Sequence, residues 1–107
     1  MVVVVFTITL RADLPRAEYE ETGTRMVELV SKMPGFLGMD YAATGDGELL
    51  VARFDSHEAL AAWRNHQEHR VVQQMGRKRF FAHYRIEVCE TVRSREFSLG
   101  DEPSRAH

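Results

Sequence analysis

The chain contains little cysteine and little proline. Its 107 residues include one cysteine, Cys89, and only three prolines. A single cysteine excludes an internal disulfide and leaves no zinc site built on cysteines. These features are typical of a protein in a reducing compartment, and we expect a cytoplasmic location.

Long runs of one residue type are also missing. No long basic run occurs, and the formal net charge is -2, which argues against nucleic acid as a partner. The apolar opening from Met1 to Phe6 has no positive residue before it and is too short for a signal peptide or a membrane span. We therefore expect neither nucleic acid nor a membrane as a partner.

What remains is an ordinary globular composition, with 44% hydrophobic residues. A domain of about 100 residues buries roughly two-thirds of its unfolded surface, so its own core is adequate but thin. We expect one domain over residues 1–97. Residues 98–107 are predicted to form a polar tail, although Phe97 and Leu99 at its start could dock on the domain.

The first part of the chain predicts a strand followed by a helix. Val2 to Leu10 is rich in β-branched residues and almost wholly apolar, as in a strand covered on both faces. Asp13 near the N-cap and Pro15 in the first turn predict the start of a helix. Its buried stripe has helical spacing and consists of Met26, Leu29, Val30 and Met33.

A hairpin and a second helical region follow. Strands are expected over residues 36–44 and 48–54, and the glycines between them would supply the positive φ of a tight turn. Asp55 and Glu58 have the spacing of a capping box for a helix that carries Leu60 and Trp63 inward. A further helical stretch, about Glu68 to Met75, would end at Gly76.

The last strand is expected over residues 80–92 and alternates in polarity, with Tyr84, Ile86 and Val88 on its apolar face. The resulting βαββαβ order is that of an α+β, ferredoxin-like split sheet. Helices can cover only one face of such a sheet, yet the first strand is apolar on both. We therefore predict a homodimer in which the second face packs on another copy.

Three sequence segments resemble the antibiotic biosynthesis monooxygenase (ABM) domain family. They are Met33-Pro34-Gly35-Phe36-Leu37-Gly38, the run from Ala62 to Arg70, and Tyr84-Arg85-Ile86-Glu87-Val88-Cys89-Glu90. The resemblance covers most of the chain, from about Val2 to Phe97. It implies a dimeric α+β barrel, formed when two ferredoxin-like sheets pack face to face. Members include cofactor-independent oxygenases of aromatic polyketides, quinol oxygenases and haem-degrading enzymes.

Candidate catalytic residues are Trp63, His69 and Tyr84. Trp63 resembles a tryptophan that several family members place in the pocket, but it could equally be a core anchor. A histidine suits proton abstraction at neutral pH, and His69 is preferred to His66 because the family often has a histidine entering this helix. Tyr84 faces the predicted pocket, with core packing as the alternative. Met26 and Val30 would line that pocket as adaptable apolar residues.

The other polar candidates have structural alternatives. His66 and His69 share a helical face and could bind a metal, but the spacing suggests no third ligand; capping at a helix junction is the other role for His66. Arg70 could stabilise an oxyanion or pair with a carboxylate. Asn65 could bind a substrate oxygen or cap a helix.

The leading functional hypothesis is a cofactor-independent monooxygenase that acts on a phenol, quinol or anthrone-like substrate with O2. The alternatives are a non-catalytic small-molecule binding domain, an isomerase or cyclase, and a haem-binding or haem-degrading protein. Haem-degrading relatives have an Asn on the first strand and a His after the tryptophan helix. The corresponding positions here are Phe6 or Thr7 and Gln73 or Gln74, so the haem set is broken twice.

Overall fold

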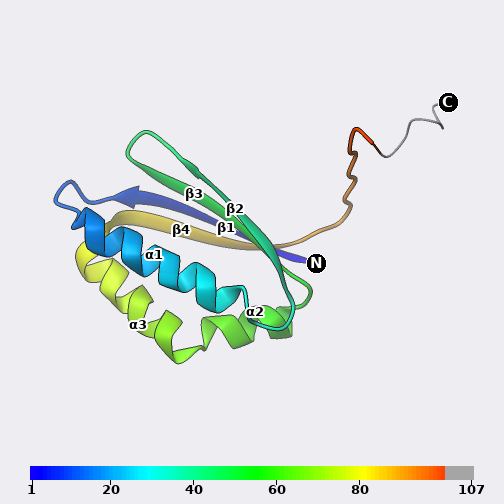
Figure 1. Ribbon diagram of the computed structural model, residues 1–107, viewed down its shortest axis with the longest axis horizontal. Coiled ribbons are helices and arrows are strands. Elements are labelled where there is room, and N and C mark those ends of the chain that lie inside the picture. The colour runs from blue at the N-terminus through cyan, green and yellow to red at the C-terminus, as the bar shows by residue number, and fades with distance from the viewer. Residues whose placement is uncertain (101–107) are drawn as a thin grey trace.

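The computed structural model describes residues 1–100 of the chain (Figure 1). Its elements, in chain order, are β1 (Val2–Leu10), α1 (Arg16–Val30), β2 (Phe36–Ala43), β3 (Gly47–Phe54), α2 (His57–Arg64), α3 (Gln67–Met75), the π-helical turn η1 (Gly76–Phe80) and β4 (Phe81–Glu90). The predicted βαββαβ order is confirmed, and its second helical region consists of α2, α3 and η1.

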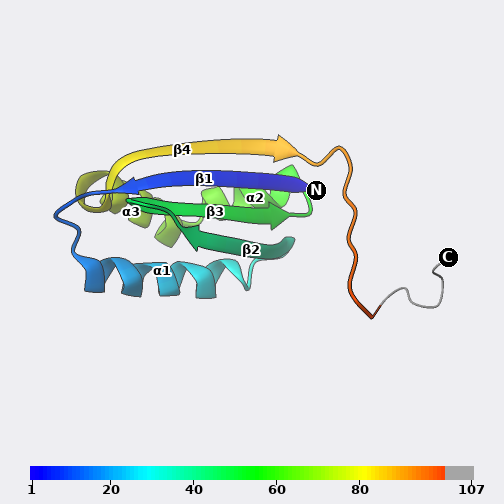
Figure 2. The ribbon, with the colours of Figure 1, turned by 90° about the horizontal axis from the view of Figure 1, so that it is seen from above.

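The four strands form one antiparallel sheet in the order β2-β3-β1-β4. Val2 lies opposite Phe54 on one side and Glu90 on the other, and Ile8 lies opposite Glu48 and Tyr84. Directly opposed residues share a face of the sheet. The helices all lie on the face that carries these residues (Figure 2), so the predicted ferredoxin-like α+β fold is confirmed.

The core gathers at the end of the sheet where β1 begins. Its buried residues are Val2, Val30, Phe54, Leu60 and Trp63. Phe36 packs edge-on against Phe54 with ring centroids 5.5 Å apart. This cluster joins β1, β3, α1 and α2, and it therefore fixes the position of the tryptophan helix.

The opposite face of the sheet carries no helix within residues 1–100 (Figure 2). Val3 and Val5 of β1 alternate with the core residues and lie opposite Arg53 and Val51. They remain partly exposed, so β1 is apolar on both faces as predicted. Within residues 1–100, no helix covers this second face.

Two predicted helix starts are wrong by one or more residues. Asp13 does not cap α1, because its carboxylate accepts hydrogen bonds from the Arg11 guanidinium at 2.8 and 2.9 Å; Pro15 occupies the N-cap position. For α2, the N-cap is Ser56, whose hydroxyl accepts from the Ala59 N–H at 3.1 Å. The capping box of Asp55 and Glu58 is therefore not formed.

The glycines of the β2–β3 hairpin have a different role from the predicted one. The hairpin glycines do not adopt positive φ, which occurs at Gly35 and Gly38. Gly47 is needed because a Cβ at this position would lie 1.7 Å from the Ile8 carbonyl oxygen on β1. By contrast, Gly76 is the C-cap of α3, as predicted, and the chain then continues into η1, with the Phe81 ring close to the Gly76 Cα.

The segment after β4 extends away from the domain (Figure 1). Val92, Phe97 and Leu99 are all largely exposed, so neither Phe97 nor Leu99 docks on its own domain. The predicted tail over residues 98–107 lies mostly outside the described residues, which end at Gly100.

Candidate functional site

Trp63 lies at the end of α2 and is 8% exposed. The Ser56 cap fixes where α2 begins, and Leu60 and Trp63, three residues apart, therefore face the core together. The indole packs in one cluster with Val2 and Phe54 of the sheet. The predicted burial of Trp63 is confirmed.

The imidazole of His69, on α3, stacks on this indole. The two ring centroids are 4.3 Å apart, and the ring planes differ by 23°. His66 is also near the indole, with a centroid distance of 5.8 Å. Nδ1 of His69 is buried and has no hydrogen-bond partner within the described part of the chain.

Burial lowers the pKa of His69, because a charged imidazolium loses solvation among the packed side chains. The nearby carbonyl groups of Trp63 and Arg64 favour the charged form and oppose this decrease in part, whereas His66 adds to it. The net pKa lies below the ordinary value. This shift favours the neutral imidazole, which is the form that can accept a proton.

Asn65 and His66 form the junction between α2 and α3. Asn65 is the C-cap of α2, and its backbone N–H donates to the Ala61 carbonyl at 2.9 Å. His66 is the N-cap of α3, where its Nδ1 accepts from the Glu68 N–H at 3.2 Å. Both residues thus have the capping role that was the alternative to ligand binding.

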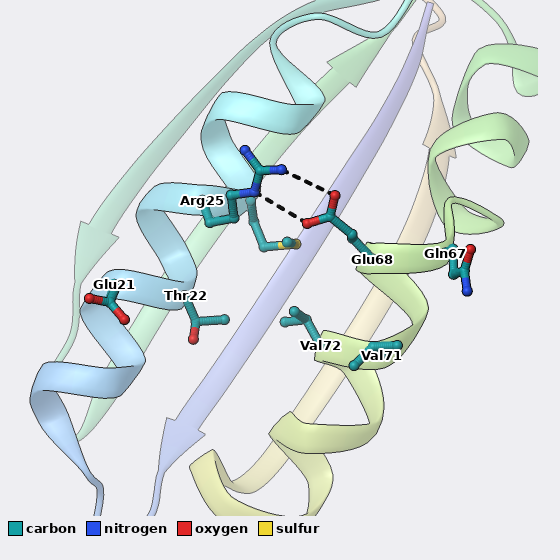
Figure 3. Close-up of a pocket in the computed structure, with 8 residues that line it drawn as sticks. Glu21, Thr22, Arg25, Gln67, Glu68, Val71 and Val72 are labelled. Carbon is teal, nitrogen blue, oxygen red and sulfur yellow. Dashed lines mark hydrogen bonds and ion pairs between the residues drawn. The ribbon is translucent and has the colours of Figure 1, made fainter.

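A groove of about 560 Å³ runs between α1 and α3 (Figure 3). Its lining comprises Glu21, Thr22, Arg25, Met26, Gln67, Glu68, Val71 and Val72. Met26 also packs against the core cluster, so it connects the groove to the region of Trp63. Of the predicted lining residues, Met26 is on the groove, whereas Val30 is buried in the core at 4% exposure.

Trp63 is not among the residues that line this groove. One face of its indole is covered by His69 rather than by open space. His69 lies one helical turn before Val72 on α3, and residues at this spacing share a helix surface. The predicted position of one indole face on a cavity is therefore not found at this groove, because His69 covers one face and neither Trp63 nor His69 lines the groove.

Tyr84 lies toward the other end of the sheet. It is opposite Ile8, six residues along β1 from Val2, a separation of about 20 Å along a strand. Its hydroxyl accepts a hydrogen bond from Nε of Arg77 at 2.9 Å, and its ring packs edge-on against Phe6. The structure thus brings Trp63 and His69 together but leaves Tyr84 apart.

Arg70 is exposed on α3. Sequence reasoning missed the polar contact that crosses the groove: Arg25 of α1 pairs with Glu68 of α3 at 3.1 Å. These residues are 43 positions apart, and no local spacing links them. Within residues 1–100, no group of three or more His, Cys, Asp or Glu side chains is arranged to hold a metal ion.

The sequence profile of the family described as antibiotic biosynthesis monooxygenase matches residues 1–75. The chain belongs to this family. A relative, the uncharacterized protein YqjZ of Bacillus subtilis (strain 168), is 38% identical over 80 residues, which cover 74% of this chain and 70% of YqjZ. Among the helices of residues 1–100, none is long and apolar enough to cross a membrane.

Solved structures share the fold of this ABM-family chain at low sequence identity. SnoaB of Streptomyces nogalater, described as a cofactor-independent oxygenase, has a TM-score of 0.70 and 17% identity, with 87% of this chain and 94% of SnoaB covered. Rv0793 of Mycobacterium tuberculosis has a TM-score of 0.76 and 18% identity, with 89% and 98% covered. A dimeric ferredoxin-like protein of Thermobifida fusca has a TM-score of 0.69 and 14% identity, with 84% and 90% covered.

Proposed function

We propose that the chain is a cofactor-independent monooxygenase that oxidises a phenol, quinol or anthrone-like substrate with O2 in the groove between α1 and α3. The observation that carries this proposal is the partly buried imidazole of His69, which stacks on Trp63 and has a lowered pKa. His69 does not itself line the groove, but it is one helical turn before Val72, which does. The proposal therefore requires the imidazole to reach a substrate held there. A neutral imidazole is the form that can accept a proton from an acidic aromatic substrate, and its lowered pKa makes it a weaker base than a free imidazole.

The chemistry requires little of the protein. His69 accepts the proton of the bound substrate, and the resulting carbanion or phenolate passes one electron to O2. The radical pair combines to a peroxide. The imidazolium of His69 returns its proton to the peroxide anion. Loss of the remaining hydrogen on the oxidised carbon and cleavage of the O–O bond then release water and leave a new carbonyl, so that one oxygen atom enters the product and the other leaves in water. The electrons come from the substrate, and no flavin or metal is required for this sequence.

The description of SnoaB as a cofactor-independent oxygenase supports this proposal. We propose no haem cofactor. The positions at which haem-degrading relatives carry Asn and His are occupied by Phe6 or Thr7 and by Gln73 or Gln74. Glutamine and phenylalanine do not supply the imidazole ligand that such a site needs.

We further propose that the working unit is a homodimer built on the uncovered face of the sheet. Val3, Val5 and Val51 on this face are apolar and adjacent, and burial of such a surface against a second copy stabilises a two-fold dimer. The description of the Thermobifida fusca neighbour as dimeric is consistent with this arrangement. The exposed free thiol of Cys89 fits a cytoplasmic location.

The test is oxygen uptake with an anthrone and a hydroquinone in buffer treated with a chelator. We expect substrate-dependent uptake above the uncatalysed rate, lost in His69→Asn and retained in the control His57→Asn, because His57 is an exposed residue at the start of α2 and does not line the groove. Binding of these substrates without uptake above background would instead identify a small-molecule binding domain, the second hypothesis. Activity without O2 would indicate an isomerase or cyclase.

A further inference from the structure

A bidentate ion pair bridges the groove. Nε of Arg25 donates to Glu68 Oε2 at 3.2 Å, and Nη2 of Arg25 donates to Oε1 at 3.1 Å (Figure 3). Two adjacent N–H groups thus hold the two oxygens of one carboxylate, which is the geometry by which arginine recognises carboxylates in general. Arg25 therefore directs its carboxylate-binding edge across the groove, toward α3.

The surroundings of this pair are mostly apolar. Met26 on α1 and Val71 and Val72 on α3 line the same groove, whose volume of about 560 Å³ lies in the range that holds a small organic ligand. Arg25 is the one cationic residue of this lining, which also contains the carboxylates of Glu21 and Glu68. Apolar surface beside a single directed cation favours a ligand with a flat hydrocarbon body and one acidic substituent.

We propose that Arg25 is the anion-recognition residue of this groove, and that Glu68 occupies the carboxylate site until an aromatic acid displaces it. The ring of the acid lies against Met26 and Val72, and its carboxylate replaces that of Glu68 on Arg25. This inference rests on the proposed function, because it names the substrate class of the same groove.

The exchange has a low energetic cost. The side chains of Arg25 and Glu68 are 51% and 47% exposed, and ion pairs at such exposure contribute little to stability. All nine residues of α3 remain at least partly exposed, so the Glu68 side chain can turn into water without leaving a buried charge. Glu28 approaches only Nη1 of Arg25, at 3.9 Å, and leaves the Nε–Nη2 edge to the ligand.

The experiment is calorimetric titration with 2-naphthoate and with 2-naphthamide, which has the same ring system and no charge. The proteins are the wild type, Glu68→Gln, Arg25→Gln and a control, Arg16→Gln. Arg16 is on the same helix, pairs with Glu20 at 3.8 Å and does not line the groove. Circular dichroism of each variant verifies that it folds.

We expect Glu68→Gln to bind naphthoate about two- to fivefold more tightly than the wild type, because the competing carboxylate is gone. Arg25→Gln should lose about tenfold or more for naphthoate, with little change for naphthamide. Arg16→Gln should match the wild type. Equal effects on both ligands, no effect of Glu68→Gln, or no binding of naphthoate to wild type and Glu68→Gln would overturn the proposal.

These results are independent of turnover. Naphthoate binding that depends on Arg25, without oxygen uptake with any substrate, would support the anion site and contradict the proposed monooxygenase activity. Equal oxygen uptake by the wild type and Arg25→Gln, with both acidic and neutral substrates, would support the monooxygenase activity and contradict the anion site.

Discussion

The imidazole of His69 lies nearly parallel to the indole of Trp63, with ring centroids 4.3 Å apart. This contact joins α3 to the core, since all nine residues of α3 are otherwise at least partly exposed while Trp63 is buried among Val2, Val30 and Phe54. Trp63 therefore has the structural role of an anchor and also positions the candidate base. Of the two roles that the sequence left open, the structure supports the core anchor, whereas Trp63 does not line the groove.

Replacement of Trp63 tests the anchoring role. We expect Trp63→Ala to lower the free energy of unfolding by about 3–5 kcal/mol, because it removes a buried ring and leaves a cavity. Trp63→Phe retains an aromatic surface for His69 and should cost less. Urea unfolding followed by circular dichroism measures both, with Val92→Ala as the control, since Val92 is 99% exposed. An equal, small effect of Trp63→Ala and Val92→Ala would contradict the buried position.

The lowered pKa of His69 makes stability depend on pH. Its folded pKa lies below the unfolded value of about 6.5, so the unfolded chain binds more protons between these two values. The free energy of unfolding should therefore fall as pH decreases through about 6.5 and level off below the folded pKa. His69→Gln should reduce this fall between pH 7.5 and 5.5. A slope that is identical in both proteins would show that His69 titrates normally.

Glu90 provides a second pH-dependent contact. Its carboxylate accepts a hydrogen bond from Nε2 of His57 at 2.7 Å, and this contact lowers the pKa of Glu90 below its ordinary value. The contribution to stability is therefore present above the unfolded pKa of Glu90 and is lost as pH falls through the folded pKa. An NMR titration should show the Glu90 pKa rising in His57→Gln. An unchanged Glu90 pKa in this variant would show that the contact does not persist in solution.

The start of α2 distinguishes the predicted cap from the observed one. Ser56→Ala removes the hydroxyl that accepts from the Ala59 N–H and should cost about 0.5–2 kcal/mol. Glu58→Ala tests the predicted capping box; Glu58 is exposed, and its loss should cost less than that of Ser56. Thermal unfolding of both variants measures the difference, and a larger effect of Glu58→Ala would restore the capping box.

Local patterns predicted the elements well, because hydrophobic periodicity follows directly from which face is buried. The errors arose where a distant or competing group decides the outcome. Asp13 pairs with Arg11 instead of capping α1, and the positive φ values occur at Gly35 and Gly38 rather than in the hairpin.

The site was harder to predict, for the same reason. His69 and Trp63 lie six positions apart at a helix junction, where the family resemblance could point to them. Tyr84 is placed by strand register, opposite Ile8, and the pairing of Arg25 with Glu68 depends on how α1 and α3 lie side by side (Figure 3). Neither of these relationships has a signal in sequence spacing.

The uncovered face of the sheet gives the last prediction. Val5 and Val51 lie opposite each other at its centre, and a homodimer would bury both. Val5→Lys or Val51→Lys would bury an unpaired charge in that interface, and the desolvation cost of this charge should prevent the dimer from forming. We expect light scattering to give twice the chain mass of 12.3 kDa for the wild type at micromolar concentration and the single-chain mass for either variant.

The control Val92→Lys, in the exposed segment after β4, should remain dimeric. A monomeric wild type would show that no dimer forms. A Val5→Lys variant that stays dimeric with unchanged stability would show that the interface lies elsewhere, because a face that is exposed to solvent accepts lysine without strain.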